Sequence, residues 1–313
     1  MTATEVAVQN WGDRFKRWSK PFSESEETMA DNAASVIRTA IDNHDGLSAR
    51  NIEVYPTGSY HNNTNVKGES DTDVAVVCHD SIFFDVPPGD TAAKYGITTP
   101  AAYSFDAFRK DVHDALAEHF GEGMTPGDKA FNVHENTCRL EADVTPFFEY
   151  RKYSGEVTTE GKWATTTGVQ SIGTNGGSFI NYHIDHYKQG VERNKDTGRR
   201  FKRITRIIKN VKFDMIENGT SAAKAVAEKI PSFLIECLVF NAPDSCFNQG
   251  DDGYVEDVRC VISELWTRTK PGGDAVQKMV EVNYRKWLFR SGQAWKVETV
   301  HEFLLEAWRH LFP

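Results

Sequence analysis

Two short stretches, residues 58–60 (GSY) and residues 70–77 (SDTDVAVV), are the most informative part of this 313-residue sequence. The second stretch has the β-branched content of a buried strand, with Asp71 and Asp73 at its leading end. Because side chains alternate across a strand, the two carboxylates point to the same face while the alternate valines enter the core. The pattern therefore predicts two acids held side by side at the start of a strand.

A third acid occurs in a comparable setting, in residues 139–148 (RLEADVTPFF). Asp143 leads into mostly apolar residues of another β-rich run, and an adjacent strand would bring it close to the first two acids. Close carboxylates repel each other unless a cation neutralises them, and Mg²⁺ prefers carboxylate, water and phosphate oxygens. The sequence thus predicts that Asp71, Asp73 and Asp143 are catalytic and hold two Mg²⁺ ions, with Mn²⁺ as a substitute. Two such ions clamp the attacking and leaving oxygens of an in-line phosphoryl displacement.

Gly58 and Ser59 are the predicted complement of the three acids. Glycine lets the backbone approach a triphosphate closely, and the following amide and hydroxyl can donate to its β- and γ-phosphate oxygens. Taken alone, this pair is equally typical of an ordinary turn, and a lone pair of aspartates can simply start a strand. The combination of both motifs with a third acid favours a nucleotide-binding catalytic site.

Composition bounds the class of protein. A length of 313 residues favours two lobes, and 39% hydrophobic with 26% charged residues is typical of a soluble globular chain. The net charge of −9 argues against a protein that coats duplex nucleic acid. The five cysteines are spread out without a CxxC pair, and there is no secretory leader, so we expect reduced thiols in a cytoplasmic protein. No apolar run approaches the roughly 18 residues of a membrane span.

Hydrophobic periodicity predicts a mixed α/β first half. Apolar residues recur at helical spacing in residues 22–44 and again in residues 105–120. Short runs rich in β-branched and aromatic residues predict strands of one sheet at residues 52–55, 73–78, 131–134 and 138–148.

The second half of the sequence has a different hydrophobic periodicity. After a turn-rich segment at residues 173–177, nearly all of the sequence has helical periodicity. The clearest predicted helices are residues 178–192, 199–217, 232–241, 254–267 and 297–311. We therefore place a lobe boundary near residue 175, with a mixed core at 1–175 that includes the long early helix and a helical lobe at 176–313.

With these motifs the sequence resembles the cGAS/DncV-like nucleotidyltransferases, bacterial signalling enzymes with a polymerase-β-type catalytic fold. The matching residues are Gly58-Ser59, residues 70–73, residues 139–148 and residues 230–237 (IPSFLIEC). The similarity spans nearly the whole chain. It implies an α+β fold in which a mixed sheet core is followed by a C-terminal helical lobe.

The activity implied by the resemblance is successive nucleotidyl transfer between ribonucleoside triphosphates, with release of pyrophosphate. Ring closure then gives a cyclic di- or trinucleotide second messenger in anti-phage signalling, and a downstream effector receives the product rather than the protein. In this family mechanism Asp71 and Asp73 ligate both metals, while Asp143 ligates one and helps to activate the attacking ribose hydroxyl. The zinc insertion of animal cGAS is absent here, so no long duplex DNA activator is expected.

A cationic stripe is predicted in the helical lobe. Arg199, Lys202, Arg206 and Lys209 share one helical face. Such a stripe can meet a triphosphate, although many are simply solvated faces. The resemblance implies Lys202 or Arg206 as the phosphate contact, without deciding between them.

Residues 232 and 233 are the other predicted nucleotide contacts in this lobe. Ser232 opens a helix, where a backbone amide, the hydroxyl and the helix dipole favour phosphate, and a simple capping role is the alternative. The resemblance implies that Ser232 touches the triphosphate and that Phe233 stacks on a base. Phe233 as a core residue is the alternative. His183 and His186 share a helix face, but the stretch lacks further ligands for a metal.

Two other functions remain open at this point. One is a nucleotidyltransferase of the same superfamily that adds nucleotides to RNA or to a small acceptor. The other is a non-catalytic nucleotide sensor, against which the presence of all three acids argues. The base, the ring size and the 2′–5′ or 3′–5′ linkage are not decided by the sequence.

Overall fold

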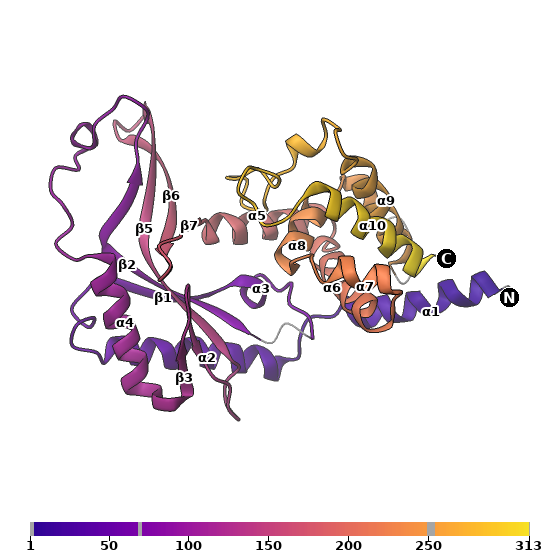
Figure 1. Cartoon of the computed structure of the whole chain (residues 1–313), viewed down its shortest axis with the longest axis horizontal. Helices are drawn as coiled ribbons and strands as arrows, with labels where there is room; N and C mark the ends of the chain where they lie inside the picture. The colour runs from indigo at the N-terminus through magenta and orange to yellow at the C-terminus, as the bar shows by residue number, and fades with distance from the viewer. Residues whose placement is uncertain (1–2, 68–70, 249–253, 313) are drawn as a thin grey trace. The chain divides into compact units, whose positions relative to one another are not determined.

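The computed structural model describes residues 3–67, 71–248 and 254–312, and the chain forms two compact units (Figure 1). The helical unit consists of residues 1–22, 61–69 and 184–313, and the sheet unit of residues 23–60 and 70–183. The division thus falls after residue 183, whereas the sequence predicted one boundary near residue 175. It also assigns two segments from the first half of the chain to the helical unit.

Helix α1 (Ala3–Trp18) shows why the first residues belong to the helical unit. Phe15 is fully buried in the core of that unit, and Trp11 and Trp18 pack against the same core. These aromatic residues lie three or four positions apart, so they occupy one helical face. Burial of that face holds α1 in the helical unit.

The sheet unit is built on a seven-stranded sheet in the order β1-β2-β5-β4-β3, with β6 pairing to β5 and β7 to β6. Strands β2 and β5 are parallel, and the other pairs are antiparallel. All four strands predicted from the sequence are present, and β3, β6 and β7 are additional. The strands are β1 (Ile52–Thr57), β2 (Thr72–Asp85), β3 (Met124–Pro126), β4 (Phe131–Val133), β5 (Ala142–Val157), β6 (Trp163–Ile172) and β7 (Ser178–Asn181).

Helices α2 (Glu24–Asp42) and α4 (Phe105–Phe120) pack against one face of this sheet (Figure 1). Val74 and Val76 join their core, as the alternation predicted, and Ala75 and Val77 face a second, smaller cluster on the opposite side. Both helices match the prediction, and Ser23 forms a capping box at the start of α2. The unit also contains α3 (Gly58–His61) and two short 3₁₀ helices, η1 (Ala92–Tyr95) and η2 (Gly121–Gly123).

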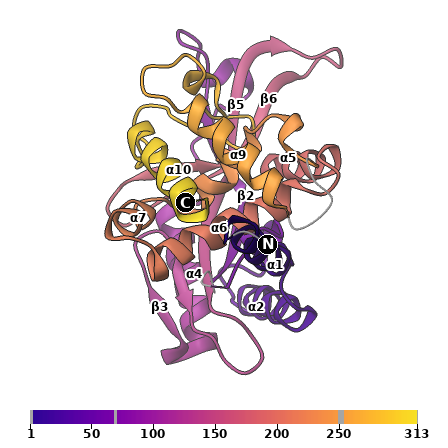
Figure 2. The same ribbon diagram turned by 90° about the vertical axis from the view of Figure 1, so that its right-hand side faces the viewer.

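The helical unit is formed by α1 and by most of the chain after β7. Figure 2 shows α10 beside α7 and α9. Helix α8 is apolar on nearly all sides and is buried from its third residue onward. No helix among the described residues is long and apolar enough to cross a membrane. The further elements are α5 (His183–Asp196), α6 (Phe201–Asn218), α7 (Ser221–Ala227), α8 (Ser232–Phe240), η3 (Asp244–Cys246), α9 (Val255–Arg268), η4 (Val276–Lys278) and α10 (Val297–Leu311).

One predicted helix begins too early. The sequence predicted a helix from residue 178, but Ser178–Asn181 is strand β7, and α5 begins only at His183. The strand pairs with Val169–Ile172 of β6, which satisfies the backbone groups that a helix would have used internally. Tertiary pairing therefore overrides the local periodicity at this point.

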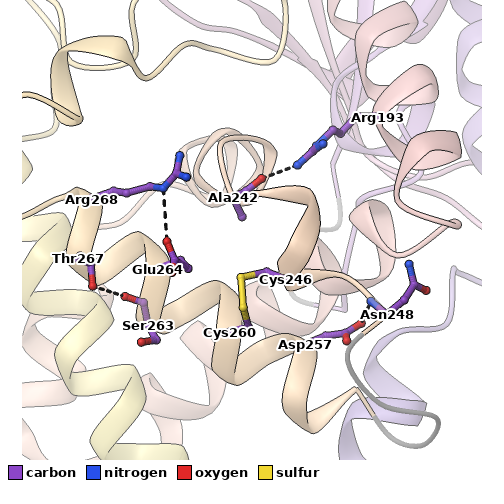
Figure 3. Close-up of a disulfide and its surroundings, with 10 residues drawn as sticks. All are labelled: Arg193, Ala242, Cys246, Asn248, Asp257, Cys260, Ser263, Glu264, Thr267 and Arg268. Carbon is purple, nitrogen blue, oxygen red and sulfur yellow. Dashed lines mark hydrogen bonds and ion pairs between the residues drawn. A yellow bond between two sulfur atoms is a disulfide. The ribbon is translucent and has the colours of Figure 1, made fainter.

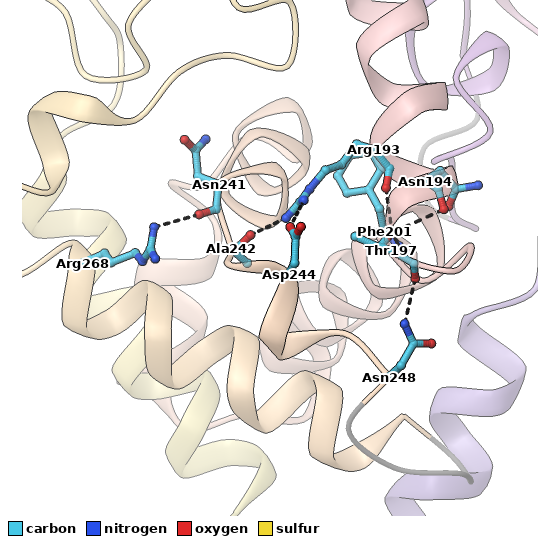
Figure 4. Close-up of polar contacts among 9 residues, drawn as sticks. All are labelled: Arg193, Asn194, Thr197, Phe201, Asn241, Ala242, Asp244, Asn248 and Arg268. Carbon is cyan, nitrogen blue, oxygen red and sulfur yellow. Dashed lines mark hydrogen bonds and ion pairs between the residues drawn. The ribbon is translucent and has the colours of Figure 1, made fainter.

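The prediction of reduced thiols is wrong for two cysteines. Cys246 and Cys260 form a disulfide (Figure 3), with their Cα atoms 5.1 Å apart. Cys78, Cys138 and Cys237 are free. Helix η3 turns the chain so that Cys246 meets α9, and Arg193 of α5 holds the preceding residues through the Ala242 carbonyl and the Asp244 carboxylate (Figure 4). The sequence shows no CxxC signal because this pairing depends on that turn.

We expect the disulfide to stabilise the helical unit. It joins residues 14 positions apart, and closing a loop of that length lowers the entropy of the unfolded chain and so raises its free energy by about 3 kcal/mol. The double variant Cys246→Ala/Cys260→Ala should therefore melt at a lower temperature than the wild type under non-reducing conditions. Cys138→Ala, which removes an exposed free thiol, is the matched control and should leave the melting temperature unchanged. Equal melting of wild type and double variant would contradict a stabilising bond.

Candidate active site

The register between β2 and β5 brings two of the predicted catalytic acids together. Asp73 lies directly opposite Asp143 in this parallel pair, and Thr72 lies opposite Ala142. The two acids occupy the sheet face that is opposite α2 and α4, because their strand neighbours Val74 and Val144 point into the α2–α4 core. Asp71 is exposed, precedes the first residue of β2 and shares the alternation of Asp73.

The environment of Asp143 disfavours its ionised form. Burial raises the pKa of this carboxyl, the hydrogen bond from Asn132 lowers it, and the negative charges of Asp71 and Glu141 raise it further. Asn132, the β4 residue opposite Asp143, donates through Nδ2 to Asp143 Oδ1 at 3.3 Å and to Glu141 Oε1 at 2.7 Å. The net shift is upward, so the site carries negative charge that a cation would stabilise.

Gly58 lies against the Asp73 carboxylate. Strand β1 ends at Thr57, opposite Asp73, and Gly58 then takes a left-handed φ of 69° to begin α3. A Cβ atom at position 58 would lie 1.8 Å from Asp73 Oδ2. Only glycine leaves room for this carboxylate, and it also tolerates the backbone conformation. The two predicted motifs therefore meet in space.

The donor set suits a hard divalent cation. Asp71, Asp73, Asp143 and Glu141 offer carboxylate oxygens, which Mg²⁺ prefers, and the pKa of Asp143 is raised by burial and also by the charges of Asp71 and Glu141. No group of three or more His, Cys, Asp or Glu side chains within the described ranges already has the arrangement of a metal site. The two-metal assignment rests on strand register and shared charge, and it stays a prediction.

Comparison with known proteins decides the family. A model of the cGAS/DncV-like nucleotidyltransferase C-terminal helical domain matches residues 188–312. The chain is similar to the cyclic dipyrimidine nucleotide synthase CdnE of Legionella pneumophila, with 38% identity covering 96% of this chain and 98% of the relative. It is also 34% identical to the cyclic dipyrimidine nucleotide synthase CdnE of Cecembia lonarensis, covering 96% and 97%. The chain belongs to the cGAS/DncV-like nucleotidyltransferases.

The fold agrees with this family assignment. The solved structure of the Rhodothermus marinus CdnE c-UMP-AMP synthase with Apcpp and Upnpp has a TM-score of 0.78 to this nucleotidyltransferase, with 28% identity over 94% of each chain. The predicted family, the α+β polymerase-β-type fold and the enzyme class are therefore confirmed.

The cationic stripe of the nucleotidyltransferase is not a simple solvated face. Arg206 and Lys209 of α6 are only 4% and 1% exposed. Four of the five N–H groups of the Arg206 guanidinium have acceptors, which are the Ser19 carbonyl and the carbonyl and side-chain oxygens of Asn63. Lys202 is half-buried, with Nζ 5.7 Å from the centre of the Tyr187 ring. Most N–H groups of Arg206 are thus already bonded within the protein. Of the two predicted phosphate contacts, Lys202 is therefore the better candidate.

Ser232 and Phe233 lie where the sequence placed them. Helix α8 begins at Ser232, directly after Pro231 at the capping position. Phe233 is 39% exposed, unlike the seven residues that follow it in the same helix, and its ring lies beside those of His186 and Trp295. An exposed ring at the start of a helix is available for stacking, so the core alternative for Phe233 is not supported.

The sequence interpretation missed Glu141 and Asn132. Glu141 precedes Asp143 by two residues, the spacing that made Asp71 and Asp73 conspicuous, so it was recognisable in principle. Asn132 had no such signal, because its role depends on the antiparallel pairing of β4 with β5. It provides the amide that holds both Asp143 and Glu141.

Gly58→Ala should abolish most activity. The added methyl group must displace the Asp73 carboxylate, and a misplacement of about 1 Å costs roughly 100-fold in rate. The matched control is Gly161→Ala, because Gly161 has a similar φ of 75° but no atom within 4 Å of the added carbon. Steady-state rates of pyrophosphate release measure both variants. Loss of activity in both, or in neither, would contradict the proposed contact.

Asp143→Asn should stabilise the protein at neutral and alkaline pH. Because the folded-state pKa of Asp143 is raised, the folded protein binds this proton more tightly than the unfolded chain does. The free energy of unfolding therefore falls as pH rises through that pKa, and the penalty is absent below about pH 4, the ordinary carboxyl range. Melting curves in EDTA should show a higher melting temperature for Asp143→Asn at pH 8, with the difference closing towards pH 4.

Asp128→Asn is the control of opposite sign. Hydrogen bonds from the Thr174 hydroxyl and the Asn175 amide lower the pKa of Asp128, so its ionised form stabilises the fold and this variant should melt lower at pH 8. Parallel shifts in the two variants would contradict the account of Asp143.

Proposed function

We propose that this nucleotidyltransferase joins ribonucleoside triphosphates into a cyclic di- or trinucleotide, with Asp71, Asp73 and Asp143 as its catalytic residues. The single observation that carries the assignment is the direct pairing of Asp73 with Asp143, with Gly58 packed on the Asp73 carboxylate. The product would act as a second messenger that switches on an effector in anti-phage defence of the CBASS kind. The catalytic core would be the sheet unit, residues 23–60 and 70–183, and the helical lobe would be the helical unit, residues 1–22, 61–69 and 184–313.

The reaction is an in-line displacement at phosphorus. A ribose hydroxyl oxygen of one nucleotide attacks the α-phosphorus of a triphosphate, the bond from that phosphorus to the bridging oxygen breaks, and pyrophosphate leaves. Asp143 would help to activate the attacking hydroxyl, and the hydroxyl proton would leave to this carboxylate or to solvent. A second transfer of the same kind closes the ring of a dinucleotide, and a trinucleotide needs a third.

The three aspartates would hold two Mg²⁺ ions, or Mn²⁺ as a substitute, which supply positive charge at the triphosphate and lower the pKa of the attacking hydroxyl. Asn132 orients Asp143 by donating to Oδ1, and Gly58 keeps the space that the Asp73 carboxylate occupies. Gly58 and Ser59 would donate to the β- and γ-phosphates as the predicted triphosphate cradle.

Residues of the helical unit would complete nucleotide binding. We assign Lys202 to a phosphate, Ser232 to the triphosphate and Phe233 to stacking on a base. Burial lowers the pKa of Lys202, Glu236 raises it and Arg206 lowers it further, so a bound phosphate would favour the charged ammonium. Arg206, the alternative phosphate contact from the sequence, has most of its donors bonded within the protein.

A pyrimidine is proposed as part of the product. The relatives with 38% and 34% identity are both described as cyclic dipyrimidine nucleotide synthases, and the solved structure of c-UMP-AMP synthase contains one pyrimidine nucleotide and one purine nucleotide analogue. We therefore expect a cyclic dinucleotide that contains uridine or cytidine monophosphate, and a trinucleotide as the alternative ring size.

Mass spectrometry of products made from all four ribonucleoside triphosphates with Mg²⁺ tests this function. We expect a phosphatase-resistant cyclic product that contains a pyrimidine, its loss in EDTA, and a fall of at least about 100-fold in Asp73→Asn and Asp143→Asn. Products from purines alone would correct the base assignment. Phosphatase-sensitive products that require added RNA or a small acceptor would favour the superfamily alternative. Nucleotide binding without pyrophosphate release would favour a sensor.

A further inference from the structure

Residues 61–67 connect the two motifs of the active site but belong to the helical unit. The chain leaves the sheet unit after Tyr60 and returns to it at residue 70. The segment is polar (HNNTNVK), yet Asn62, Thr64, Asn65 and Val66 are all 9% exposed or less. Burial of a polar segment is favourable only when its polar groups are hydrogen-bonded. The hydrogen bonds of residues 61–67 therefore identify the side chains that hold this segment in place.

The first anchor is a buried carboxylate of α8. Thr64 donates through Oγ1 to Glu236 Oε2 at 2.8 Å, and the other oxygen of Glu236 lies 3.0 Å from His186 Nε2 of α5. Burial alone would raise the pKa of Glu236, but the charge and hydrogen bond of His186, the charge of Lys209 and the Thr64 bond lower it to about 2. Glu236 is thus a charged acceptor inside the helical unit, and charged acceptors make the stronger hydrogen bonds.

The second anchor is the Arg206 guanidinium of α6. It donates to the backbone carbonyl of Asn63 and, at 3.0 Å, to its Oδ1 atom, and it also donates to the carbonyl of Ser19. Asn63 has a left-handed φ of 54°, a conformation in which asparagine is enriched. The arginine therefore holds the turn that follows α3, one residue before the Thr64 anchor.

We propose that Glu236 and Arg206 are positioning residues that fix residues 61–67 and thereby orient the Gly58-Ser59 turn for nucleotidyl transfer. The inference rests on the proposed function of the three aspartates and adds a requirement to it. Gly58 begins the single turn of α3, which ends at His61, and the anchored residues follow directly. Few backbone φ and ψ angles can therefore change between Gly58 and the anchors. Loosening the anchors would remove the restraint on the residues that directly follow Gly58 and Ser59, so this turn would lose part of its fixed orientation.

A purely structural role predicts a different result. If these contacts only stabilised the helical unit, their loss would lower the melting temperature, and the folded fraction would keep a normal turnover number. Positioning predicts that fully folded enzyme turns over slowly, because orientation contributes to the rate in the transition state. The kcat of folded variants separates the two roles.

Thr64→Val is the decisive variant, because it keeps the shape of the side chain and removes the donor to Glu236. Assayed well below its melting temperature, it should lose about 10- to 100-fold in kcat with a smaller change in KM. Thr64→Ser keeps the hydroxyl and should restore kcat to within about threefold. The matched control is Thr269→Val, because Thr269 is also fully buried in the helical unit and donates to Leu265, remote in sequence from residues 61–67.

Asn63→Gly is an independent variant for the second anchor. Glycine accommodates the left-handed backbone and removes the side-chain acceptor of Arg206, so the protein should fold and lose part of its kcat. The inference is supported if Thr64→Val and Asn63→Gly lower kcat while Thr269→Val does not. It is overturned if both segment variants turn over like Thr269→Val.

An inactive wild type would count against the proposed function rather than against the anchors. Amide hydrogen exchange of residues 61–67 then tests the anchors without an activity assay. Exchange in this segment should be faster in Thr64→Val than in the wild type and unchanged in Thr269→Val. Unchanged exchange in Thr64→Val would overturn the inference by itself.

Discussion

Parallel pairing of β2 with β5 is the constraint on which the site depends. The two strands are far apart in the sequence, and their register alone decides that Asp73 meets Asp143. A slip of one residue would turn one of these acids into the α2–α4 core and a valine towards the nucleotide. The buried alternation of valines on the core face makes such a slip costly, so the packing of the hydrophobic core also protects the chemistry.

The cost of this arrangement is electrostatic. The sheet end gathers Asp71, Asp73, Glu141 and Asp143, and the raised pKa of Asp143 records the repulsion and burial that follow. One Asn132 amide offsets part of that cost by donating to two of the carboxylates. Active sites commonly retain such unfavourable charge because the substrate complex uses it, and the rest of the fold then supplies the missing stability.

Local patterns in the sequence were sufficient for part of the structure. The helix at residues 105–120 and the last helix at residues 297–311 coincide with their predicted ranges because their apolar stripes face a core. Strands β6 and β7 were missed, since β6 is rich in exposed threonine and β7 has helical periodicity that only pairing overrides. The three aspartates and Gly58 were found from motifs. The buried anchors of residues 61–67 were not found, because a polar run in a sequence is typical of a solvent-exposed segment.

The discontinuous helical unit has a consequence for synthesis of the chain. The backbone passes between the units after residues 22, 60, 69 and 183, so Phe15, made well before α6, can reach its buried place only after α6 and the following helices have been translated. The segment matched by the family model, residues 188–312, likewise lacks α1 and the buried Thr64 when it is cut out. Domains generally fold as units, so this helical unit must wait until α10 has been translated, and a chain without α10 would leave apolar surfaces of the unit uncovered.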